Sequence, residues 1–285
     1  MNPRAESSRA ARERRQPARA EHLESQWSRL HAGDREPWPE EPAIAALAKK
    51  QAGFGAWLQT HGHPRALARE LRHAWLEFHQ GQFRKASARA RDLGPLGACV
   101  ANKAAAVETL YARDSQRVLA LLSTAIERGE QAVEMLPQYP NTHYTLALVL
   151  GRYSQRISIL KALAAGLAGR VRTHLEKTVA LESHHAEAHV ALGLYHAEIV
   201  NKLGALAAAV TYGASGEKAL EHFRRAVRLA PSAPIVRVEY ANGLLLIDAD
   251  RYRAEARELY EQAAACEPAD AMERADVERA RRGLP

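Results

Sequence analysis

From residue 43 onward, apolar residues recur every three or four positions, the spacing of one face of an amphipathic helix. Ala43–Leu58 and Arg65–Gln80 follow this spacing, and Gly62 stands between them as a stop signal. No β-branched run alternates with polar residues between turn residues, so no strand is expected. The sequence predicts an all-α chain. Further helices are expected over 98–111, 118–135 and 270–283, with a pair of helices in each of 140–183, 186–231 and 235–268.

The segment 186–231 carries a second pattern, in which small, aromatic, small and proline residues follow one another at spacings of four, three and five. These residues are Ala219, Phe223, Ala226 and Pro231. Gly193 and Ala219 lack bulk, so the backbones of two helices can approach each other there. Phe223 would fill the space toward the next hairpin. Pro231 would end the second helix, because proline cannot continue one.

The same pattern recurs along the chain and resembles the tetratricopeptide repeat (TPR), a helical hairpin that stacks on its neighbours. The resemblance covers about residues 66–268 and implies a right-handed superhelical stack of hairpins, an α-solenoid. Units are expected at about 66–95, 97–137, 140–183, 186–231 and 235–268, with a solvating C-terminal cap at 270–283.

The units at 140–183 and 186–231 are longer than a standard repeat. His143, Leu146 and Ala147 each have a counterpart 46 residues later, whereas a TPR unit has a period of about 34 residues. The excess lies between the two helices of each unit and is rich in Ala, Gly and Leu. These insertions either lengthen the packed helices or leave an apolar channel between the hairpins.

Residues 1–40 are polar, and Pro37 and Pro39 limit any helix there. We expect a disordered basic arm that docks, if at all, through Trp27 or Trp38. Of the net charge of +7, +4 lies in residues 1–20, which hold six arginines and two glutamates. The rest of the chain is nearly neutral, so nucleic acid is not an expected partner. A contact of the arm with RNA or an anionic membrane is the alternative.

Two distant cysteines, Cys99 and Cys266, do not make a disulfide framework. The N-terminus has no apolar segment typical of a secretion signal, and the longest apolar run, Leu203–Tyr212, is about half of a membrane span. The expected protein is cytoplasmic and has no stable membrane insertion. No pattern indicates its oligomeric state.

The TPR resemblance implies a ligand-binding concave groove lined by helix A of each unit. Carried onto two successive units, the lining residues are Asn141, Tyr144, Leu148 and Arg152, then Glu187, Val190, Leu194 and Glu198. Tyr144 and Leu148 occupy the positions of the basic clamp that binds chaperone tails, so chaperone docking is not expected. The groove predicts a non-enzymatic scaffold that binds a protein or peptide. Alternatively, these residues pack against a neighbouring helix or the N-terminal arm.

A second hypothesis from a different class is a carrier that holds a small hydrophobic ligand between the two insertions. A third is a metal-dependent enzyme, because His185, His189 and His196 share one helix face. Packing is the favoured interpretation, because His189 and His196 occupy repeat positions that pack against helix B and no HExxH motif accompanies them. Phosphate-loop and nucleophile-elbow motifs are absent, and Ser215 in GASGEK fits a helix N-cap. The sequence predicts no catalytic residue, metal or cofactor.

The elongated hairpins also resemble those of regulator-of-microtubule-dynamics proteins and of TPR lipoproteins associated with TRAP transporters. The lipoproteins require an export signal and a lipidated cysteine, which this N-terminus lacks. Segments such as LHAGDREPWP and YANGLLLI are similar to those of uncharacterised bacterial TPR proteins. This resemblance implies a family but no activity.

Overall fold

The computed structural model describes residues 20–284 except 113, 159–160 and 163–164. All regular structure in these residues is helical. The helices are α2 (Ala20–Leu30), α3 (Glu41–Lys50), α4 (Ala52–His61), α5 (Pro64–His79), α6 (Phe83–Ala90), α7 (Gly94–Tyr111), α8 (Ser115–Met135), α9 (Pro140–Ser154), α11 (Leu167–Leu181), α12 (Ala186–Leu203), α13 (Ala205–Tyr212), α14 (Gly216–Leu229), α15 (Pro234–Ala264) and α16 (Ala271–Gly283).

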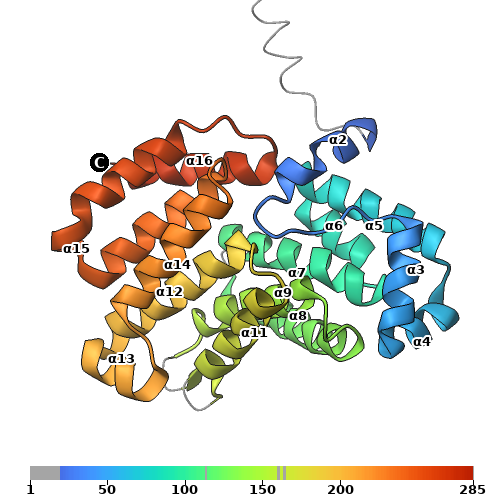
Figure 1. Cartoon of the computed structure of the whole chain (residues 1–285), viewed down its shortest axis with the longest axis horizontal. Helices are drawn as coiled ribbons and strands as arrows, with labels where there is room; N and C mark the ends of the chain where they lie inside the picture. The colour runs from blue at the N-terminus through green and yellow to red at the C-terminus, as the bar shows by residue number, and fades with distance from the viewer. Residues whose placement is uncertain (1–19, 113, 159–160, 163–164, 285) are drawn as a thin grey trace, which may run out of the picture.

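Successive helices pack in pairs, and the pairs stack into an α-solenoid, which confirms the predicted fold class. The pairs are α5 with α6, α7 with α8, α9 with α11, and α12 with α14. They follow one another from cyan through green to orange in Figure 1. Asp248, whose φ of −164° and ψ of 97° are not helical, divides α15 into the two helices of the last pair.

The small and aromatic positions of 186–231 pack as their spacing predicts. Ala219, Phe223 and Ala226 are completely buried. A Cβ on Gly193 would lie 2.6 Å from the Phe223 ring, so only glycine allows α12 and α14 to come so close. Phe223 also stacks on Tyr240 of α15, with ring centroids 5.1 Å apart. Phe223 therefore joins two hairpins. Ser215 is the N-cap of α14, as predicted, and its side chain accepts a hydrogen bond from the Lys218 N–H.

The structure corrects the single helix expected over Ala43–Leu58. Gln51 adopts extended backbone angles and separates α3 from α4. Its side-chain Oε1 accepts a hydrogen bond from the Gln138 N–H, at 3.0 Å. The two short helices therefore pack across each other instead of continuing in one direction. Periodicity could not reveal this, because the break preserves the apolar spacing on both sides.

Residues 20–40 are also not a disordered arm, whereas residues 1–19 of that prediction lie outside the described residues. Leu23 and Trp27 are four positions apart on one face of α2, and both are buried in the core. The Trp27 indole packs edge-on against Trp75 and donates a hydrogen bond to the Glu36 carbonyl, at 2.7 Å. Burial of these two large side chains offsets the entropy of ordering a polar segment.

The C-terminal helix is more than a solvating cap, because Val277 and Ala280 on α16 are buried. The segment before it reaches the N-terminal helices. Asp270 accepts a hydrogen bond from His79 of α5, at 2.7 Å, and Arg29 of α2 donates one to the Glu267 carbonyl, at 3.0 Å. The two ends of the described chain therefore meet, as the blue and red segments do in Figure 1.

Candidate functional site

The predicted groove residues fall into two groups, and the chain itself covers the first. Residues 31–36, which follow α2, lie over the N-terminal ends of α9 and α12. Asn141 donates hydrogen bonds to the Asp34 carbonyl, at 3.0 Å, and to the Glu36 carboxylate, at 2.6 Å. The Glu187 N–H donates to the Gly33 carbonyl, at 2.9 Å. The alternative that groove residues pack against the N-terminal segment therefore holds for this end.

A buried ion cluster fixes this cover. Lys103 of α7 lies 2.5 Å from the Asp34 carboxylate and 3.0 Å from that of Glu187. The Tyr144 hydroxyl donates to the Glu187 carboxylate, at 2.7 Å. Burial by itself would raise the pKa of Asp34, but His31 and Lys103 hold that pKa well below its usual range. The Tyr144 hydroxyl and the Glu187 carboxylate are therefore both engaged within this cluster.

Two other buried carboxyls have raised pKa values instead. Burial, together with the charge of Asp34, raises the pKa of Glu36 to about 8. Burial also raises the pKa of Asp276 on α16 to about 8, although Arg279 opposes the shift.

Val190, another predicted groove residue, is buried in a hairpin core with Ala226 and does not line an open surface.

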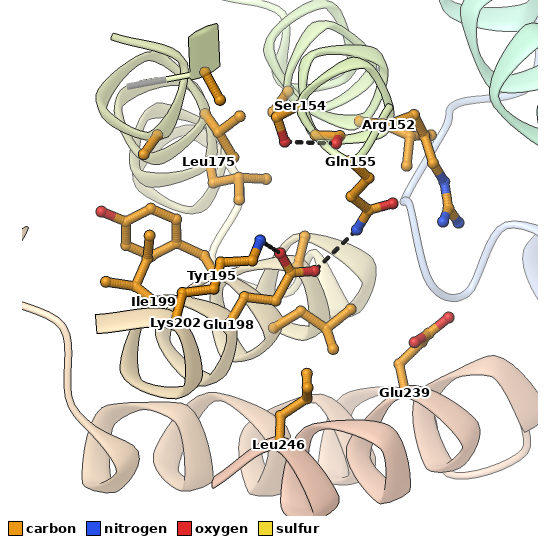
Figure 2. A pocket seen from close by; sticks show the side chains of 18 of the residues that line it. Arg152, Ser154, Gln155, Leu175, Tyr195, Glu198, Ile199, Lys202, Glu239 and Leu246 are labelled. Carbon is orange, nitrogen blue, oxygen red and sulfur yellow. Dashed lines mark hydrogen bonds and ion pairs between the residues drawn. The ribbon is translucent and has the colours of Figure 1, made fainter. Parts of the chain in front are cut away.

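The second group of predicted residues lines an open cavity of about 530 Å³, here called the open groove. Leu148 and Arg152 line it from α9, and Leu194 and Glu198 line it from α12. Figure 2 shows Arg152 and Glu198 among the side chains around it. Its remaining side chains come from the same two helices and from α11, α15, α16 and the segment after α9. The floor is largely apolar: Leu148, Val171, Leu175, Ala191, Leu194 and Leu246.

Polar side chains stand at two places around this floor. At one end the Glu198 carboxylate accepts hydrogen bonds from Lys202 and Gln155, both at 2.9 Å (Figure 2). At the other end, the Arg152 side chain extends from α9 toward Glu239 of α15 (Figure 2). The Arg152 Nε is buried and has no hydrogen-bond partner. Burial lowers the pKa of Arg152, and the charge of Glu239 only partly opposes this.

His143, His189 and His196 pack against the second helix of their hairpins, as predicted, whereas His185 contacts Asn141 and Tyr144 of α9. The Nδ1 atoms of His143 and His174 lie 3.0 Å apart, and those of His189 and His222 lie 2.9 Å apart in the following unit. His196 stacks on His222 with an angle of 12° between the rings. Within the described part of the chain, no group of three or more potential ligands is arranged to hold a metal ion.

This architecture is similar to that of known proteins. The sequence model of the family described as regulator of microtubule dynamics protein 1-3 matches residues 98–284, more than half of the chain. The chain belongs to this family. The matched residues include both elongated hairpins and the whole predicted groove, so the resemblance noted from the insertions is confirmed.

This member of the regulator of microtubule dynamics family is similar in fold to a solved structure, that of a thermophilic TPR protein of Thermus thermophilus. The two share 17% identity with a TM-score of 0.55, over 75% of this chain and 98% of that chain. At this identity the likeness shows a TPR-like fold alone. None of the curated sequences compared with the chain matches it. No helix among the described residues is long and apolar enough to cross a membrane.

Sequence reasoning missed the residues that other parts of the chain bring to the groove. Asp34 covers one end, Lys103 holds it there, and Arg279 of α16 lines the open groove. Trp27 and Trp38 did indicate that the N-terminal segment is ordered, because aromatic residues are uncommon in disordered segments. Nothing in the pattern of Lys103 or Arg279 distinguishes them from surface residues.

Proposed function

We propose that this protein is a non-enzymatic scaffold that binds a segment of a partner polypeptide in the open groove. The open groove, with its apolar floor between two polar ends, is the observation that carries this proposal. Such a surface suits an extended or helical segment, whose apolar side chains reach the floor while its polar groups meet the rim. The family's TPR-like fold supports it, because helical repeats expose concave surfaces of this kind.

Only part of the predicted groove takes part in this function. Leu148, Arg152, Leu194 and Glu198 remain candidate contact residues. Asn141, Tyr144 and Val190 are assigned to the interior, and Glu187 is assigned to the ion cluster with Lys103. The proposal requires no cofactor, and it retains the expected cytoplasmic, bacterial setting as part of the hypothesis. The microtubule-related name belongs to the family, and nothing in the groove suggests a tubulin-specific surface.

Affinity capture from an extract of the native host, followed by binding measurements with the purified partner, tests the proposal. Leu194→Asp places a charge on the apolar floor and should weaken binding at least tenfold, by about 1.4 kcal/mol or more. Leu206→Asp is the matched control, because Leu206 is 81% exposed on α13, outside the open groove. Equal binding by the wild-type protein and Leu194→Asp would refute the scaffold hypothesis.

A carrier of a small hydrophobic ligand is the second candidate. The volume of about 530 Å³ falls within the range of small-molecule sites. Ile157, Ala162 and Ala168 from the first insertion and its flank line the same cavity, so the two hypotheses concern one site. Native mass spectrometry separates them. A bound small molecule that is absent from a Leu194→Trp variant supports the carrier, whereas a co-purifying polypeptide supports the scaffold.

A further inference from the structure

Arg152 brings a positive charge into the open groove without an acidic partner. Its Nε is buried and unbonded, and no ion pair within 4.0 Å is formed by its guanidinium among the described residues. The Glu239 carboxylate at the same end is already engaged by Arg279, at 2.8 Å, and by Asn242, at 2.9 Å. The half-buried Arg152 side chain therefore lacks the neutralising contact that a guanidinium with a buried nitrogen normally has.

Two other cations, the buried Lys103 and the half-buried Arg279, show the contrast. Lys103 contacts the carboxylates of Asp34 and Glu187, and Arg279 contacts that of Glu239. A purely structural role for Arg152 would call for the same arrangement, because burial of an unpaired charge destabilises the folded protein. Its charge is satisfied instead if an anion enters the open groove.

We infer that the partner segment carries a carboxylate beside an apolar side chain, and that Arg152 binds this carboxylate. The inference rests on the proposed function, because it concerns the same groove. Leu148 lies one helical turn before Arg152 on α9 and lines the same cavity as Leu194 and Leu246. An apolar side chain on this floor therefore places a neighbouring Asp, Glu or chain-terminal carboxylate at the guanidinium, which can bind it through two hydrogen bonds.

Selection of random peptides displayed on phage against the full-length protein tests this inference. We expect the enriched peptides to share an acidic residue or a free C-terminus next to Leu, Ile or Phe. A counter-selection on Leu194→Asp removes peptides that bind elsewhere. If no peptide distinguishes the wild-type protein from Leu194→Asp, the proposed scaffold function fails together with the inference.

The best peptide is then compared with its Asn or Gln version on Arg152→Met. For the wild-type protein, loss of the carboxylate should weaken binding about tenfold or more, the effect of one hydrogen-bonded charge. Arg152→Met should bind both peptides equally weakly, and Arg152→Lys should recover part of the preference. Arg170→Met is the control, because Arg170 pairs with Glu130 outside the open groove.

The two failures are separable. Peptides that need Leu194 but contain no carboxylate, or that bind wild type and Arg152→Met with equal affinity, would overturn the role of Arg152 and leave the scaffold intact. Arg152→Met should also unfold at the same temperature as wild type or a higher one, because it removes a half-buried charge that forms no ion pair. A lower unfolding temperature together with equal weakening of acidic and neutral peptides would identify a structural role and refute the inference.

Discussion

Replacement of Lys103 by Met removes the cation that holds the N-terminal segment over the groove. The Lys103 ammonium lies between the carboxylates of Asp34 and Glu187, whose side chains are 3% and 18% exposed. Methionine has a similar length and fills the same space without a charge. The change therefore leaves two carboxylates close together, with little access to water and no neutralising partner.

The expected loss of stability follows from this geometry. Removal of one member of a buried ion pair typically costs about 3–5 kcal/mol, because the remaining charge stays desolvated. Here two charges lose the partner, although Asp34 keeps His31 at 2.8 Å and Glu187 keeps the Tyr144 hydroxyl at 2.7 Å. We therefore expect the free energy of unfolding to fall by about 3–5 kcal/mol at pH 7.

Urea unfolding followed by circular dichroism at pH 7 and at pH 4.5 measures this effect. The pKa of Asp34 is depressed in the folded wild-type protein, so its contribution is present above the unfolded pKa and is lost as the pH falls through the folded pKa. Without Lys103 the pKa values of Asp34 and Glu187 should rise. Both carboxyls can then take up protons in the folded variant, and its stability deficit should be smaller at pH 4.5 than at pH 7.

The matched control is Lys202→Met, which breaks the exposed pair with Glu198 and should change stability by less than about 1 kcal/mol. A deficit below about 1 kcal/mol for Lys103→Met at pH 7, or a deficit that grows toward pH 4.5, would refute the buried-cluster interpretation.

Four other substitutions test the packing and the electrostatics. Gly193→Ala should destabilise the protein by about 1–3 kcal/mol, because the added Cβ would meet the Phe223 ring at 2.6 Å. Gly169→Ala, which has open space at the Cβ, should stabilise the protein by up to about 1 kcal/mol. Thermal unfolding of both variants checks this. Asp276→Asn should change the free energy of unfolding relative to wild type more favourably at pH 8.5 than at pH 5. The reason is that the raised pKa of Asp276 makes the wild-type protein lose stability as the pH rises toward about 8. Urea unfolding midpoints at both pH values check this. Trp27→Ala should cost about 3–5 kcal/mol in urea unfolding if α2 belongs to the core, and a near-neutral result would restore the disordered arm.

The local pattern of the sequence was sufficient for the repeat architecture. Small residues at Gly193 and Ala219, with Phe223 between hairpins, report contacts between neighbours in the chain, and such contacts repeat with the sequence. The same logic found Leu148, Arg152, Leu194 and Glu198, because one helix face determines which residues a solenoid turns inward.

Only the tertiary structure decided how much of that inward face stays open. Asp34 and Arg279 reach the groove from opposite ends of the chain, and their positions depend on long-range contacts such as those of Lys103 and Asp270. A helical period contains no information about contacts between distant segments. The sequence by itself therefore determined the solenoid and its concave face, whereas packing of the chain ends on that face determined which residues became core and which line a site.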